Sequence, residues 1–77
     1  ELPKEEWFKI IKNAKEVGIS SITFTGGEVL QHNDWFEIIK YTKEIGITVT
    51  LLTNGTLWNK EKINKSKNYI DEIQISL

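Results

Sequence analysis

Residues 7–27 read WFKIIKNAKEVGISSITFTGG, and residues 35–55 read WFEIIKYTKEIGITVTLLTNG. The two stretches are offset by 28 positions and are identical at 11 of 21 positions. Self-similarity of this kind indicates one supersecondary unit used twice. Any two helix–strand units share part of such a pattern, but this simpler interpretation also predicts one unit in two copies.

Each copy opens with the pattern of an amphipathic helix. In the first copy the i, i+3, i+4 spacing is occupied by Trp7, Ile10, Ile11, Ala14 and Val17. Pro3 suits the start of that helix, and Gly18 is expected to end it in a left-handed conformation. In the second copy we expect Asp34 to cap the helix, with Glu37 completing a capping box, and Gly46 to end it.

A third, weaker helix–strand unit follows the second copy. We therefore expect helices near 4–17, 34–45 and 59–67 and strands near 20–25, 48–53 and 72–77. Parallel strands need crossover connections such as these helices provide, and the crossovers are right-handed. The predicted fold class is α/β, with three parallel strands in sequential order and the helices on one face. Such a unit belongs either to a doubly wound sheet or to part of an α/β barrel.

Small and polar residues follow the strands at their carboxyl ends, where parallel α/β proteins bind ligands. The segments are TGGE at 25–28, TNGT at 53–56, and Ser76. If the two threonines and Ser76 share one face, period two also assigns three further residues to it, namely Thr23, Leu51 and Gln74. The opposite face, beneath the helices, would hold Ile22, Phe24, Leu52, Ile73 and Ile75. A polar face fits the interior of an open barrel that holds a ligand, although a two-layer sheet with one solvated face would show the same alternation.

The Gly26-Gly27-Glu28 turn has a chemical interpretation. Two glycines let a ligand approach the main chain closely. The Glu28 carboxylate suits an ammonium group, because charge-assisted hydrogen bonds are the strong ones. It would repel phosphate, so this is no P-loop, and the G-x-G-x-x-G pattern of dinucleotide sites is absent. A plain tight turn is the simpler interpretation of Gly-Gly-Glu alone, but its position after a parallel strand, one unit before TNGT, makes the motif specific.

Composition excludes several classes of function. The chain has no cysteine and one histidine, so neither a disulfide nor a Cys/His metal site is available. Ten basic and 11 acidic residues give no electrostatic case for nucleic acid, and no apolar run suggests a membrane span. We expect a cytoplasmic protein whose lysine-rich run 59–67 is a solvated helix face. His32 is interpreted as a surface residue, and Trp7 and Trp35 as core anchors.

Three segments together are similar to the middle of the radical S-adenosylmethionine enzymes: ITFTGGEVL at 22–30, TLLTNGTL at 50–57 and IDEIQISL at 70–77. The similarity covers nearly the whole chain and is closest to members that modify peptides or assemble quinone and molybdenum cofactors. It implies an incomplete (β/α)₆ barrel that holds a [4Fe–4S] cluster and S-adenosylmethionine. In that family the cluster reduces the sulfonium, and the resulting 5′-deoxyadenosyl radical abstracts hydrogen from a peptide or small-molecule substrate.

The resemblance also implies site residues, position by position. Gly26, Gly27 and Glu28 match the motif that meets the methionine amino group. Ser76 matches a serine near the ribose and carboxylate of the cosubstrate, and Thr53 and Asn54 lie towards cosubstrate or substrate. Two features depart from the family pattern. Val29 stands where a proline is usual, and the three cysteines that hold the cluster are missing.

These departures define what we expect of the chain. Residues 1–77 would be a partial radical S-adenosylmethionine domain, without the unit carrying the cysteine motif and without the C-terminal half of the barrel. Alone it would hold no cluster, catalyse nothing, and bind S-adenosylmethionine weakly or undetectably. If folded alone it would form a homo-oligomer, through a strand edge or an inner face bearing Leu51 and Val49. Two alternatives remain open, a non-catalytic binding module and a structural oligomerising unit. A C-x₃-C-x₂-C motif upstream of residue 1 would favour the enzyme.

Overall fold

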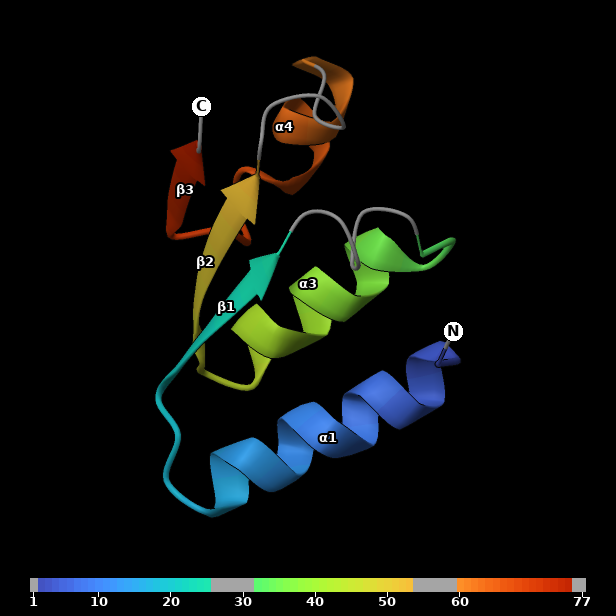
Figure 1. Ribbon diagram of the computed structural model, residues 1–77, viewed down its shortest axis with the longest axis vertical. Coiled ribbons are helices and arrows are strands. Elements are labelled where there is room, and N and C mark those ends of the chain that lie inside the picture. Colours follow the sequence, from blue (N-terminus) through green and yellow to red (C-terminus); the bar gives the residue numbers. More distant parts are fainter. Residues whose placement is uncertain (1, 26–31, 54–59, 76–77) are drawn as a thin grey trace.

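The computed structural model describes residues 2–25, 32–53 and 60–75. Its elements in chain order are α1 (Lys4–Glu16), β1 (Ser21–Thr25), α3 (Trp35–Glu44), β2 (Thr48–Thr53), α4 (Lys60–Ser66) and β3 (Glu72–Ile75). The three strands form one parallel sheet in the order β1-β2-β3 (Figure 1). The predicted fold class is confirmed, and every helix and strand begins within one residue of its expected position.

Glycines end the first two helices in the same way. Gly18 and Gly46 have φ values of 96° and 94°, a region that L side chains rarely adopt. The N–H of Gly18 donates to Lys15 O, and the next residue, Ile19, donates to the carbonyl of Ala14. The same pair of bonds follows α3, from Gly46 to Lys43 and from Ile47 to Thr42. Both copies of the repeat therefore end in a Schellman motif, as the glycine positions predicted.

Asp34 is at the predicted N-cap, but two details at the helix starts differ from the predictions. Pro3 occupies the N-cap position of α1, one residue before the helix. Asp34 is at the N-cap of α3, but its side chain makes no capping hydrogen bond. Glu37 does not reach back to Asp34 because its carboxylate binds Lys4 of the neighbouring helix at 2.9 Å. The capping-box prediction was wrong, because the Glu37 carboxylate bonds to Lys4 and the Asp34 N–H donates to His32 instead.

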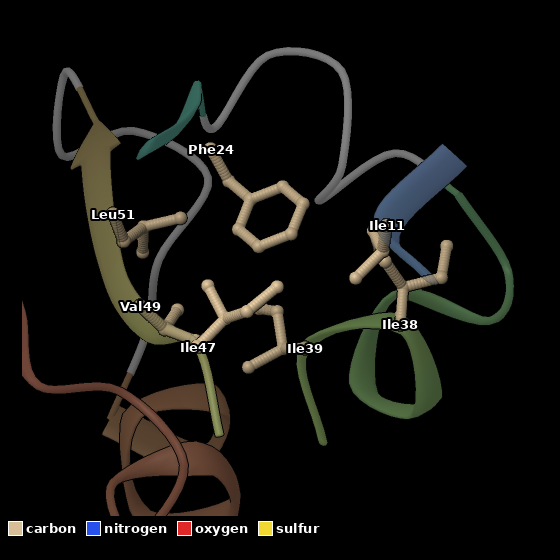
Figure 2. Close-up of a cluster of buried hydrophobic side chains, with 7 residues drawn as sticks. All are labelled: Ile11, Phe24, Ile38, Ile39, Ile47, Val49 and Leu51. Carbon is tan, nitrogen blue, oxygen red and sulfur yellow. The ribbon is translucent and has the colours of Figure 1, made fainter. Parts of the chain in front are cut away.

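The hydrophobic core lies between the sheet and helices α1 and α3, which lie side by side (Figure 1). Figure 2 shows its buried members, Ile11, Phe24, Ile38, Ile39, Ile47, Val49 and Leu51. Phe8 of α1 stacks on Tyr41 of α3 with ring centroids 4.4 Å apart. Trp7 and Trp35 are partly buried and pack against this core, which confirms their interpretation as anchors.

The predicted facing of β2 was wrong. Phe24 is paired with Leu51, and Ile22 with Val49, so all four side chains lie on the helix-covered side. Leu51 is 0% exposed, whereas Leu52 is half-buried on the opposite side. The prediction put Thr53 on the same side as Thr25. The side to which each residue of β2 points is set instead by the burial of every second residue, among them the apolar Val49 and Leu51. Leu51 and Val49 are thus core residues and do not lie on an open inner face.

The other side of the sheet is polar and bears no packed helix in the described part of the chain. Neighbouring strands align its residues in rows, Thr23 with Thr50 and Glu72, and Thr25 with Leu52 and Gln74. The two β1 threonines, Glu72 and Gln74 are exposed. The expectation of a polar face is therefore confirmed for Thr23, Thr25 and Gln74. We call this side the open face.

Candidate functional site

The carboxyl ends of the three strands meet at one edge of the sheet. Thr25, the last residue of β1, is paired with Leu52, and Thr53, the last residue of β2, is paired with Ile75. Adjacent strands lie about 4.8 Å apart. The segments that follow Thr25, Thr53 and Ile75 in the sequence therefore leave the sheet from neighbouring positions. These segments begin with the three motifs identified in the sequence.

Of the predicted site residues, only Thr53 falls within the described structure. Gly26, Gly27, Glu28, Asn54 and Ser76 lie outside the described residues. Thr53 is 5% exposed and lies on the helix-covered side, the same side of β2 as Leu51 and Val49. Its side chain therefore does not join Thr25 on the open face, and that part of the prediction was wrong.

The open face supplies hydrogen-bonding groups beneath these strand ends. The hydroxyl groups of Thr23, Thr25 and Thr50 can both donate and accept. On β3 the Gln74 side-chain amide donates to the Glu72 carboxylate at 3.0 Å. A ligand seated at this edge would thus meet hydroxyl, amide and carboxylate groups. Leu52 is the single apolar side chain in the two rows.

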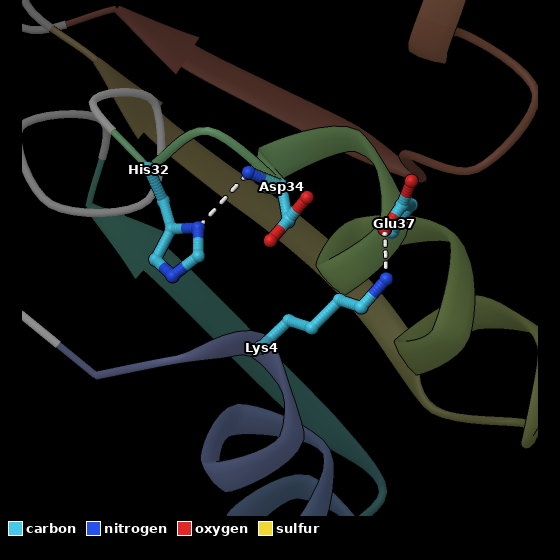
Figure 3. A network of polar contacts seen from close by, with 4 residues as sticks. All are labelled: Lys4, His32, Asp34 and Glu37. Carbon is cyan, nitrogen blue, oxygen red and sulfur yellow. Dashed lines mark hydrogen bonds and ion pairs between the residues drawn. The ribbon is translucent and has the colours of Figure 1, made fainter.

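His32 lies where the chain re-enters the described structure before α3, and it is 7% exposed. Its Nδ1 accepts a hydrogen bond from the Asp34 N–H at 2.9 Å (Figure 3). Its Nε2 lies 2.5 Å from the carbonyl oxygen of Leu2. A carbonyl only accepts, so Nε2 carries the proton and the ring is the neutral Nε2–H tautomer. The interpretation of His32 as a surface residue was wrong.

Beside His32, Lys4 and Glu37 form a second link between the starts of α1 and α3 (Figure 3). The Glu37 carboxylate accepts a hydrogen bond from Lys4 and raises the pKa of that ammonium group above its ordinary value of 10.5. Both side chains are largely exposed, so the ion pair contributes little stability. The sequence signal for these contacts was weak, because the partners are 33 positions apart for Lys4 and 30 for His32.

A cleft of about 150 Å³ lies between α1 and β1, and its lining residues are Trp7, Ile10, Ile11, Ile22, Thr23, Phe24 and Thr25. Trp7 Nε1 is buried without a hydrogen-bond partner among the described residues.

The described residues include no group of three His, Asp or Glu side chains that could hold a metal ion. Within the same residues, no helix has the length and apolar character required to cross a bilayer.

Comparison with protein families identifies a match. The family model of the Radical SAM superfamily matches residues 1–77, the entire chain. The chain belongs to the radical SAM superfamily. No curated protein and no solved structure matches the chain in the corresponding comparisons. Membership agrees with the parallel α/β arrangement of the described residues.

Radical SAM membership implies S-adenosylmethionine and a [4Fe–4S] cluster in full-length members. The residues present here do not fit the cluster. Cluster irons are held by cysteine thiolates, and the 77 residues contain none. For S-adenosylmethionine, the described residues offer the hydroxyl, amide and carboxylate groups of the open face, which can donate and accept hydrogen bonds.

Proposed function

We propose that residues 1–77 form the part of a radical SAM oxidoreductase that binds the methionine end of S-adenosylmethionine. The observation that carries this proposal is the shared edge of the sheet. Thr25 is paired with Leu52 and Thr53 with Ile75, so the Gly-Gly-Glu, Thr-Asn-Gly and Ser76 motifs follow adjacent strand ends. This pairing supports one site built from motifs that are 28 and 23 positions apart in sequence (Thr25 to Thr53, Thr53 to Ser76).

The proposed site consists of Gly26, Gly27, Glu28, Thr53, Asn54 and Ser76. Glu28 accepts hydrogen bonds from the methionine ammonium, and the glycines let that group approach the main chain. Thr53 is buried, so it acts by fixing the strand end from which Asn54 follows. When bound, the cosubstrate supplies the sulfonium whose reductive cleavage starts radical chemistry on a peptide or small-molecule substrate. The chain's own residues bind and orient it.

The cluster must be held by cysteines outside these 77 residues. We therefore propose that residues 1–77 act as one portion of a larger radical SAM domain, with the cluster-binding unit supplied by another part of the polypeptide. This proposal rests on the absence of cysteine from the sequence combined with the family match. In its parent the portion would form three consecutive strands of the incomplete barrel.

The site is tested by Glu28→Ala and Asp34→Ala in the complete product of the gene. Asp34 is a matched control because its side chain makes no capping bond, while its main-chain N–H persists in the variant. A hydrogen bond to a charged group contributes about 1.5–3 kcal/mol, so Glu28→Ala should weaken S-adenosylmethionine binding about tenfold to a hundredfold. Isothermal titration calorimetry measures the change. Equal effects of the two substitutions would reduce Glu28 to a turn residue and refute the proposed site.

A further inference from the structure

The repeat places the same helix position in two different surroundings. Ile10 of α1 and Ile38 of α3 are equivalent residues, 28 positions apart. Ile38 is 0% exposed and lies beside Ile11 of the preceding helix in the core (Figure 2). Ile10 is 51% exposed. The residues that follow, Ile11 and Ile39, are buried in both copies. The difference is therefore confined to one side of α1, the side that corresponds to the α1-facing side of α3.

The cleft between α1 and β1 lies on this side of α1. Ile10 lines it together with β1 residues from both sides of the sheet, such as Phe24 and Thr25, whereas none of the described β2 residues does. The cleft therefore runs along the edge of β1 that β2 does not occupy. The described residues that line it carry no charge, and its volume of about 150 Å³ is enough for a benzene-sized apolar group.

β1 is an edge strand in the described part of the chain. Alternate main-chain N–H and C=O groups of such a strand point away from its one partner and can pair with another strand. Edges are commonly protected by charged residues or proline, and the strand Ser21–Thr25 includes neither. The strand at the other edge, β3, carries Glu72. Trp7, which also lines the cleft, has a buried Nε1–H without a partner among the described residues. The β1 edge thus fits a further strand.

The repeat also indicates what covers this side of the molecule. The second copy is covered by a helix–strand unit, with α1 against α3 and β1 parallel to β2. We propose that the edge of β1 and the cleft beside it bind a further helix–strand unit of the same polypeptide. The added strand runs parallel to β1, and an apolar side chain of that unit fills the cleft against Ile10. The inference rests on the proposed function, in which residues 1–77 are one portion of a larger domain.

Hydrogen–deuterium exchange of the complete gene product tests this inference without any substitution. If the edge is covered, every main-chain N–H of residues 22–25 exchanges slowly, as in β2. If the edge is open, alternate N–H groups of β1 exchange fast, which would overturn the inference. Residue-resolved mass spectrometry at two protein concentrations about a hundredfold apart identifies the occupant. Protection that is lost on dilution would assign the edge to a second copy of the chain, which would also overturn the inference.

Ile10→Gln and Val17→Gln form a matched pair in the same gene product. Val17 is 77% exposed and does not line the cleft. Glutamine is a good helix former, so helix propensity changes little. We expect Ile10→Gln to lower the melting temperature by about 5 °C or more and to speed exchange in β1, because its amide would be buried in an apolar cleft. Val17→Gln should melt within about 2 °C of wild type. Equal shifts would contradict a cover over Ile10.

The outcomes distinguish this inference from the proposed function. If Glu28→Ala weakens S-adenosylmethionine binding while β1 exchanges as an open edge, the inference fails and the proposed site stands. If β1 is protected at both concentrations while Glu28→Ala has no effect, the docking surface stands and the proposed site fails.

Discussion

Leu51 and Leu52 are adjacent in sequence but lie on opposite sides of the sheet. Substituting each of them therefore tests directly which residues of β2 face the core. Leu51 is 0% exposed in the core beside Phe24 and Val49 (Figure 2). Leu52 is half-buried on the open face, in a row with Thr25 and Gln74. The same substitution, leucine to alanine, is made at each position, which removes the same atoms from two environments.

The expected cost differs because only one site leaves a cavity. Truncating a fully buried leucine destabilises a protein by about 2–5 kcal/mol, as lost transfer energy plus the cavity left behind. A half-buried leucine loses only about half of its burial energy on truncation, or about 1 kcal/mol. The two variants should thus differ by about 2 kcal/mol, which is about 30-fold in the unfolding equilibrium constant.

Thermal melts followed by circular dichroism measure this difference. For a domain of this size 1 kcal/mol corresponds to about 4–8 °C, so Leu51→Ala should melt about 8–16 °C below Leu52→Ala. Leu52→Thr, which continues the polar row, should melt close to Leu52→Ala. The reverse order of the two alanine variants would place Leu51 on the open face and refute the register. Equal losses would mean that both sides of β2 are covered.

Four further predictions concern the Asp71 carboxylate, the helix-ending glycines, the iron–sulfur cluster and self-association. Lys43 and the Val49 N–H hold the pKa of Asp71 below its ordinary value of 3.8, so Asp71 stabilises the fold above that pH and loses this contribution as the pH falls through its folded-state value. Asp71→Asn should therefore be less stable than wild type at neutral pH, and urea titrations should show the gap closing in acid. Gly46→Ala should cost about 1–2 kcal/mol through its positive φ, and more than Gly18→Ala, because a buried isoleucine follows only the former; chemical denaturation decides. Anaerobic reconstitution of the 77-residue chain should yield no stoichiometric iron or sulfide, and a stable cluster would contradict the cysteine argument. If that chain folds alone, light scattering across a dilution series should show a dimer or larger oligomer, and a cooperative monomer at every concentration would oppose this.

Element types and starts could be predicted from the sequence because their determinants are local. The spacing of apolar residues predicted α1 and α3, and Gly18 and Gly46 end them through bonds to residues three and five positions earlier. Parallel pairing in sequential order follows from helices between strands. These features depend on contacts within one helical turn or one crossover. The 28-residue repeat then presented the same signals twice.

The contacts of the candidate site depend on residues far apart in sequence, and they were harder to predict. Leu2 and His32 meet only because α1 and α3 pack side by side, so His32 looked like any loop histidine. The same packing brings Lys4 to the Glu37 carboxylate, so Glu37 bonds to Lys4 and does not form the expected capping box. The phase of β2 was readable, since apolar Ile47, Val49 and Leu51 alternate with threonines. It was mispredicted because the repeat aligned two threonines.

The two copies of the repeat differ in which side of the sheet equivalent strand residues face, because Ser21 is paired with Thr48 and not with Val49, its equivalent in the repeat. β1 begins three positions after its glycine, and β2 begins two positions after its own. Ile47 enters the core and Ile19 stays exposed, so the second strand starts one residue earlier and presents the opposite face at equivalent positions. Of the two threonines that the repeat aligns, only Thr25 therefore presents its hydroxyl to the open face. In the proposed site, a ligand would thus meet the Thr25 side chain of β1 directly, whereas the buried Thr53 side chain would hold the end of β2 from the core side.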